Sequence, residues 1–208
     1  MQSITKTYRA SFREKGSKFI GFLFPVETTE QFESRLSDIK SDYPDATHHC
    51  YGWRMDPNDL GEFAQDDGEP AGTAGLPILN QLKSYDMVNS GCVVVRYYGG
   101  TNLGKSGLIR AYGEAAKRCL EQASFSKLIP TRNFRVIYPY SQQSKIDQLK
   151  HTFDLKEIDS QYLEKITLKL ACRLKQADTF WQEIQNIEHH GIEVKKGEAS
   201  YVTLASTD

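Results

Sequence analysis

The sequence lacks cysteine pairs, long apolar runs and an excess of charge of either sign. Its 4 cysteines are widely spaced and form no C-x-x-C pair, so we expect reduced thiols in a cytoplasmic protein rather than a disulfide framework. No apolar run approaches the roughly 20 residues of a membrane span, and the first residues lack the apolar core of a signal peptide. The 26 basic residues balance the 27 acidic ones, which argues against a global field that attracts nucleic acid or a membrane.

Aromatic residues, by contrast, are plentiful. The 208 residues include 10 Phe, 11 Tyr and 2 Trp, enough for a hydrophobic core in one large domain or two small ones. Hydrophobic periodicity predicts alternating strands and helices in the first part of the chain. We expect strands at 4–13, 17–26, 46–55 and 93–98, and helices that begin near Thr28, at an N-cap on Thr73 and near Ser106.

The second part of the chain restarts this pattern after a predicted linker at 125–133. The expected order is strand, helix, two strands, helix and strand, which is typical of the ferredoxin-like arrangement. The sequence therefore predicts a two-domain α+β protein, with an N-terminal α/β domain at 1–128 and a C-terminal ferredoxin-like domain at 133–206. The elements of the second domain are a strand at 134–138, a helix at 141–153, strands at 155–162 and 165–174, a helix at 177–190 and a strand at 192–204.

A glycine-rich segment, Gly99–Gly104, separates a β-branched strand from a helix that runs to Ala123. We call it the glycine loop. Consecutive main-chain N–H groups in such a loop, together with the positive end of the helix dipole, favour a phosphate or a carboxylate. The sequence therefore predicts phosphate or nucleic-acid binding here. The residues predicted for this site are Arg96, Gly99, Gly100, Asn102, Gly104, Lys105 and Arg110.

The same segment matches the phosphate-loop pattern of NTPases, G-x-x-x-x-G-K-S from Gly99 to Ser106. An NTPase also needs a parallel sheet in which one strand ends in an acid that holds Mg²⁺. No apolar run ending in an acid follows Ala123, so we interpret the match as accidental. The simplest alternative is that the glycines only permit a tight turn between strand and helix.

A long irregular stretch rich in acids, residues 56–75, precedes the central strand, and we call it the acidic loop. Long loops in compact domains are usually functional or mobile. The spacing of Asp66, Asp67 and Glu69 does not match an EF-hand. A solvated loop, or one whose acids pair with Arg96 or Arg110, is favoured over cation binding. An enzymatic alternative places Asp67 or Glu69 as general base, acting on a small phosphorylated substrate in a cleft between the two loops.

Two histidines and a cysteine adjoin one another at His48, His49 and Cys50. A zinc site needs three or four ligands, and no second pair lies at a suitable spacing, so we expect neither a metal nor a cofactor. Neighbouring residues of a strand point apart, so His49 is not placed to activate Cys50 as a nucleophile. His48 and His49 join the three acids in one candidate functional loop.

Basic residues cluster in the N-terminal hairpin, where Lys6, Arg9, Arg13, Lys15 and Lys18 oppose only Glu14. If the hairpin and the glycine loop share a face, they form a phosphate-binding stripe, with Tyr97 and Tyr98 available to stack on RNA bases. The alternative is two ordinary solvated faces balanced by the acidic loop.

Three longer stretches carry a resemblance to a known family. They read RYYGGTNLGKSGLIRAY from Arg96, DDGEPAGTAG from Asp66 and THHCYGWR from Thr47, and they resemble the IMPACT family with its YigZ-type bacterial members. Lys105-Ser106 stands where many relatives carry small residues. The resemblance implies an N-terminal domain similar to the second domain of ribosomal protein S-five, and a C-terminal domain similar to the last domain of elongation factor G. It brings no established catalytic residues.

Both of those fold relatives work on the ribosome or on RNA, and eukaryotic family members resemble regulators of translation. From this resemblance we expect a cytoplasmic, non-enzymatic protein that engages RNA or translation factors and regulates translation. The enzymatic hypothesis stays open, as does a protein-binding module that uses the sheet face or edge of the C-terminal domain. Fold analogy alone is a weak basis for choosing among them.

Overall fold

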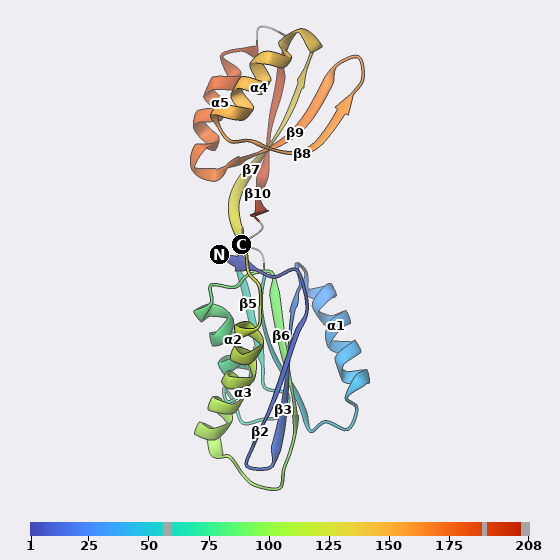
Figure 1. The fold of residues 1–208 in the computed structure, drawn as a ribbon, viewed down its shortest axis with the longest axis vertical. Helices are drawn as coiled ribbons and strands as arrows, with labels where there is room; N and C mark the ends of the chain where they lie inside the picture. The colour runs from blue at the N-terminus through green and yellow to red at the C-terminus, as the bar shows by residue number, and fades with distance from the viewer. Residues whose placement is uncertain (56–59, 189–190, 205–208) are drawn as a thin grey trace. The chain divides into compact units, whose positions relative to one another are not determined.

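The computed structural model describes residues 1–55, 60–188 and 191–204. The chain divides into two compact units, Met1–Lys127 and Leu128–Leu204. Each unit combines a sheet, helices and its own hydrophobic core (Figure 1). The predicted α+β class is confirmed.

The first unit is built on a sheet with the strand order β2-β3-β6-β4-β5, in which every described pairing is antiparallel. Its opening hairpin turns at Lys15 and Gly16, whose φ angles of 46° and 81° suit a two-residue hairpin loop. The absence of a parallel sheet from the described residues removes the NTPase interpretation of the glycine loop. The strands are β2 (Tyr8–Glu14), β3 (Ser17–Pro25), β4 (His48–Met55), β5 (Gly61–Gln65) and β6 (Ser90–Tyr97).

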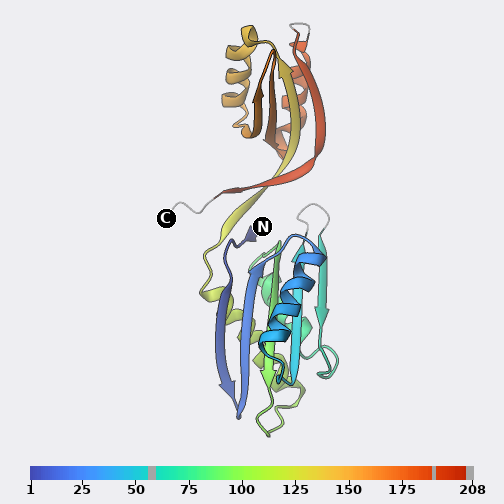
Figure 2. The same ribbon diagram turned by 90° about the vertical axis from the view of Figure 1, so that its right-hand side faces the viewer.

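Helices cover both faces of this sheet: α1 (Thr29–Asp42) lies on one face, and α2 (Gly75–Ser84) and α3 (Gly104–Glu121) lie on the other (Figures 1 and 2). Val93 and Val95 of β6 pack with α1, whereas Cys92 and Val94 pack with α2 and α3. Burial on both faces explains why the central strand is an unbroken apolar run. The same alternation directs Arg96 toward the α3 side of the sheet.

The second unit has the order β10-β7-β9-β8, with two helices between its strands along the chain. This order of elements confirms the predicted ferredoxin-like arrangement. Figure 2 shows both helices on one face of the sheet, which leaves the other face without a helix. The elements are β7 (Ser126–Tyr138), α4 (Gln143–Thr152), β8 (Lys156–Tyr162), β9 (Ile166–Arg173), α5 (Ala177–Gln185) and β10 (Glu193–Leu204), with 3-10 turns at Tyr140–Gln142 and Leu174–Gln176.

Three expectations were wrong. The predicted linker at 125–133 is the first part of β7, whose beginning pairs with β1 (Gln2–Ser3). The acidic loop contains a strand, β5, because Trp53 and Phe63 stack across β4 and β5. Thr73 does not cap α2, because its hydroxyl donates to the carbonyl of Pro70. Residues 56–59 of the acidic loop, 189–190 of the predicted helix and 205–206 of the predicted second domain lie outside the described residues.

Among the described residues, no helix is both long enough and apolar enough to span a membrane.

Candidate functional site

The glycine loop is an exposed corner between β6 and α3. Its entrance is held by internal hydrogen bonds: the N–H of Tyr98 donates to Thr47 Oγ1 at 3.0 Å, and the N–H of Gly99 donates to Ser17 Oγ at 3.2 Å. The structure therefore gives the Gly99 N–H a partner inside the unit, in place of the predicted phosphate.

The hairpin turn lies directly against this corner. A Cβ added to Gly16 would lie 2.8 Å from the carbonyl oxygen of Gly99, so only glycine permits this approach. The strand that follows the turn also pairs with the strand that leads into the glycine loop, since Lys18 of β3 is the register partner of Tyr97 of β6. The sequence left open whether hairpin and glycine loop share a face, and the structure brings their tips together, with Lys15 exposed at the turn.

The rest of the glycine loop is open. Among the described residues, no hydrogen-bond partner is present for the main-chain N–H groups of Gly100–Leu103. Positions corresponding to a Cβ on Gly100 or Gly104 meet no atom within 4 Å. The loop therefore has free space beside Gly100 and Gly104 that a ligand oxygen could fill.

The N-terminus of α3 also differs from those of α1 and α2. The hydroxyl of Thr28 caps α1 and Glu30 lies in its first turn, while α2 is capped by a carboxylate from the acidic loop. In contrast, α3 has no side-chain cap and no acid in its first turn, where Lys105 is exposed and makes no ion pair with a described acid. A lysine at the positive end of a helix is unfavourable unless an anion compensates it.

The carboxylate that caps α2 belongs to Asp66. Its Oδ1 accepts hydrogen bonds from the N–H groups of Ala74 and Gly75, both at 2.9 Å, and its Oδ2 accepts one from Gly72 at 2.8 Å. Burial by itself raises the pKa of Asp66, but these three N–H donors outweigh it and the pKa is lowered. Asp66 therefore shapes the acidic loop rather than offering a base to a substrate.

We expect Asp66→Asn to destabilise the first unit by about 1–2 kcal/mol at pH 7, the cost of losing an N-cap. Because folding lowers the pKa of Asp66, its stabilisation is present above the unfolded-state value of about 3.9 and is lost as the pH falls below it. The difference in unfolding free energy between wild type and variant should thus shrink below about pH 4.

Urea unfolding measures this difference. The chain has 2 tryptophans, Trp53 in the first unit and Trp181 in the second, so a Trp181→Phe background makes the fluorescence specific for the first unit. Exposed Asp45 serves as the control, since its replacement by Asn should change little at any pH. A gap between Asp66→Asn and wild type that is the same at pH 3 and pH 7 would contradict the capping role.

Glu69 lies at the centre of a buried polar cluster. Its Oε1 forms an ion pair with Arg96 Nη1 and accepts a hydrogen bond from the Tyr112 hydroxyl at 2.7 Å. The side chains of Arg96 and Glu69 are only 6% and 4% exposed. The guanidinium also lies 5.5 Å from the ring centroids of Phe19 and Tyr98. Of the alternatives that the sequence left open for the acidic loop, the structure shows pairing with Arg96, through Glu69.

This burial changes the role of Arg96. Its Nη1 and Nη2 contact Glu69 and Ser17, and the residue is 5% exposed. The structure therefore places Arg96 inside the unit as the anchor of the acidic loop, where an RNA phosphate cannot reach it without displacing Glu69.

The two histidines and Cys50 hold the acidic loop to β4. His48 Nδ1 lies 2.7 Å from the carbonyl oxygen of Asp67, and the N–H of His49 donates to the Asp67 carboxylate at 2.6 Å. The Cys50 thiol donates to the carbonyl of Asp66 at 2.9 Å. Burial raises the pKa of Cys50 well above its usual value, so a thiolate nucleophile is absent at neutral pH.

The described residues contain no group of three or more histidine, cysteine or acidic side chains arranged to hold a metal ion. Burial also lowers the pKa of His49, despite the nearby Asp67 carboxylate. Both histidine rings contact groups of the protein itself. His49 Nε2 lies 3.1 Å from the carbonyl oxygen of Tyr43, and His48 Nε2 lies 3.8 Å from Glu69 Oε1.

The remaining predicted residues lie apart. Asn102 is exposed in the loop, where its Oδ1 accepts a hydrogen bond from the Tyr98 hydroxyl at 3.3 Å. Arg110 lies farther along α3 and lines a hollow of about 410 Å³ together with Glu14 and Glu114. The structure thus gathers Gly100, Asn102, Gly104 and Lys105 at the corner, and leaves Arg110 beside acids.

Sequence reasoning missed the hydroxyl groups that organise this corner. The hydroxyl oxygens of Ser17 and Thr47 accept hydrogen bonds from the main-chain N–H groups of Gly99 and Tyr98 respectively. The Tyr112 hydroxyl donates one to Glu69. Helical spacing identified Tyr112 as a core residue, but spacing carries no information about the partner of a phenol hydroxyl. A buried tyrosine usually finds a hydrogen-bond partner for its hydroxyl, so the predicted burial of Tyr112 was the feature that could have indicated a polar partner.

Known proteins resemble this chain across both units. The Impact N-terminal domain family matches residues 15–120. The IMPACT family member YigZ of Escherichia coli (strain K12) is 36% identical over 159 residues, which cover 76% of this chain and 78% of that protein. The IMPACT family member YvyE of Bacillus subtilis (strain 168) is 33% identical over 191 residues, which cover 91% and 87%. A solved crystal structure of a hypothetical protein is 30% identical, with a TM-score of 0.65, and covers 95% of this chain and 97% of that chain.

Proposed function

The chain belongs to the IMPACT family, and we propose that it is a non-enzymatic protein that regulates translation by binding RNA of the translation machinery. The glycine loop would hold an RNA phosphate through the N–H groups of Gly100–Leu103. Lys105, and Lys15 of the neighbouring hairpin, would add positive charge.

The open N-terminus of α3 is the observation that carries this proposal. The protein's own groups fill the corresponding position of α1 and α2, whereas α3 has neither a side-chain cap nor an acid in its first turn and carries Lys105 as its second residue. The hairpin turn adds a second cation from a distant part of the sequence. These features favour a phosphate, which is the anion that RNA presents repeatedly.

The acids of the neighbouring loop favour binding over catalysis. An enzyme acting at this corner would need Asp67 or Glu69 as a free base. The Asp67 carboxylate accepts a hydrogen bond from the main chain of His49, and Glu69 is shared between Arg96 and Tyr112. Both acids are therefore engaged in holding the acidic loop in place.

Filter binding to tRNA and rRNA tests the proposal. Replacing Lys15 and Lys105 by Gln should remove about two phosphate contacts, so the slope of log affinity against log salt should fall by roughly 1.4 where these lysines contact a single-stranded part of the RNA. The matched control replaces exposed Lys6 and Arg35 by Gln, because Lys6 precedes β2 at the opposite end from the turn and Arg35 lies on α1.

Two results would refute a role of the glycine loop in RNA binding. One is the absence of salt-sensitive binding to either RNA. The other is an equal loss of slope in the Lys15/Lys105 variant and in the Lys6/Arg35 control, since that would show only a general charge effect.

A further inference from the structure

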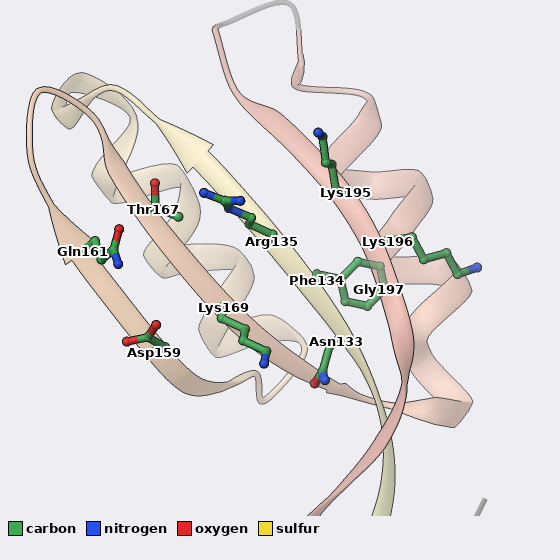
Figure 3. A pocket seen from close by; sticks show the side chains of 10 residues that line it. All are labelled: Asn133, Phe134, Arg135, Asp159, Gln161, Thr167, Lys169, Lys195, Lys196 and Gly197. Carbon is green, nitrogen blue, oxygen red and sulfur yellow. The ribbon is translucent and has the colours of Figure 1, made fainter. Parts of the chain in front are cut away.

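The helix-free sheet face of the second unit carries a hollow of about 290 Å³ (Figure 3). Three basic side chains line it from three adjacent strands: Lys195 from β10, Arg135 from β7 and Lys169 from β9. Neighbouring strands lie about 4.8 Å apart, so this basic row spans roughly 10 Å. All three residues are exposed. We call this surface the basic row.

The basic row is costly to the isolated protein. Arg135 and Lys169 are direct register partners in the antiparallel pair, and like charges in that position repel each other. Among the described residues, neither they nor Lys195 form an ion pair. By contrast, Lys150, Lys165 and Arg173 elsewhere in this unit, and Lys196 at the border of the hollow, each have an acidic partner.

One acid beside the row offsets part of its positive charge. Asp159 of β8 is the register partner of Lys169 and lines the same hollow, but the two side chains make no ion pair within the described part of the chain. The Asp159 carboxylate instead accepts a hydrogen bond from the N–H of Ser160 at 2.9 Å. Lys196 also borders the hollow, yet Figure 3 shows it pointing away, toward its partner Asp178.

The chemistry of the hollow indicates how a ligand would be held. The outward side chains of β7 and β9 that line the hollow are Asn133, Arg135, Thr167 and Lys169, which are all polar. Their outward register partners Ala171 and Ile137 are apolar, and Phe134 is fully buried. Within the described lining of the hollow, no exposed aromatic ring is offered for a base to stack on. Cations without rings suit the phosphate backbone of a nucleic acid and read no sequence.

Asn133 favours RNA among phosphate-bearing ligands. Its side-chain oxygen is buried and has no hydrogen-bond partner among the described residues, which is unfavourable for a polar atom. A ligand reaches this oxygen when the Asn133 side chain turns outward into the hollow that it lines, and there it would accept a hydrogen bond from a ribose 2′-hydroxyl, which a phosphate oxygen cannot donate. The 2′-hydroxyl is the group that distinguishes RNA from DNA at a given site.

We propose that the basic row is a second RNA-binding surface, which contacts the sugar–phosphate backbone without reading its sequence. It is separate from the glycine loop and belongs to the other unit. This inference rests on the proposed function and extends it, because the chain would then have two surfaces that bind the phosphates of RNA. The residues of the basic row can be tested independently of those of the glycine loop.

Fluorescence anisotropy with the full-length chain and a labelled single-stranded RNA of about 12 nucleotides tests this surface. Replacing Arg135 and Lys169 by Gln should weaken binding about tenfold at low salt and lower the salt slope by roughly 1.4. The matched control replaces Lys145 and Lys175 by Gln; both are exposed, lie in α4 and the turn before α5, and should leave the slope unchanged. Loss of repulsion should keep the Arg135/Lys169 variant folded, which its urea midpoint verifies.

Three outcomes would overturn the inference: a slope that Arg135→Gln with Lys169→Gln leaves unchanged, equal affinity for DNA of the same sequence, or equal competition by polyglutamate, which would indicate an acidic protein partner. The Lys15/Lys105 variant, measured in parallel, separates the two proposals. Loss of binding in that variant alone would refute RNA binding by the basic row and support RNA binding by the glycine loop. Loss of binding in the Arg135/Lys169 variant alone would refute RNA binding by the glycine loop and support the basic row.

Discussion

Replacing Glu69 by alanine is expected to lower the unfolding free energy of the first unit by roughly 3–5 kcal/mol, the cost of breaking a buried ion pair by removing one partner. The variant leaves the Arg96 guanidinium buried without its carboxylate and removes the acceptor of the Tyr112 hydroxyl. Both side chains of the pair are nearly inaccessible, so water cannot compensate for the loss. Urea unfolding of the Trp181→Phe background, followed by Trp53 fluorescence, measures the change.

Two controls make this test specific. Glu114→Ala breaks an ion pair with Arg118 on the surface of α3, where the side chains are 40% and 43% exposed, and should cost less than about 0.5 kcal/mol. The double replacement of Glu69 and Arg96 by Met should cost less than the sum of the two single replacements, because it leaves no unpaired charge. A cost for Glu69→Ala as small as that for Glu114→Ala would show that the acidic loop is not anchored through this pair.

Gly75→Ala is expected to destabilise the first unit by about 3 kcal/mol, the upper end of typical overpacking penalties. A Cβ at this position, the first residue of α2, would lie 2.7 Å from the carbonyl carbon and oxygen of Gln65 at the end of β5. Neither main chain can move aside cheaply, because Asp66 holds the two segments together through Ala74 and Gly75. The same urea assay measures the loss.

Gly72→Ala is the matched control in the same loop. Gly72 has a φ of 74°, but a Cβ there would meet no atom within 4 Å, so only the backbone preference of about 1–2 kcal/mol is lost. The close approach of Gln65 predicts the larger penalty for Gly75. If Gly72→Ala proved equally or more destabilising, backbone conformation would outweigh packing as the reason for glycine in this segment.

Local patterns in the sequence were sufficient for most elements of both units. The spacing of Phe32, Leu36 and Ile39 predicted the buried face of α1, and the order of elements after the central helix predicted the ferredoxin-like unit. The errors lie where local signals are weak. The first half of β7 contains Pro130 and polar residues, and it forms a strand because Gln2 and Ser3 pair with its beginning.

The candidate site was predictable only in part. Glycines between a strand and a helix indicated a corner, and the structure shows an open one. Arg96, however, was grouped with the phosphate-binding cations, because it lies close to the glycine loop in sequence. Its partner Glu69 lies 27 positions away in sequence, so pattern analysis could offer this pair only as an alternative. The basic row of the second unit was missed entirely, because its cations come from three separate strands.

Sequence alone determined the family, the α+β class and the position of the glycine corner, since each depends on short-range patterns of residue type. Tertiary structure decided which charged side chains pair with one another inside the protein and which remain exposed to a ligand. The reason is physical: a charged side chain is buried or exposed according to neighbours brought together by folding, as Arg96 meets Glu69 in the core while Lys105 and Arg135 meet no described acid.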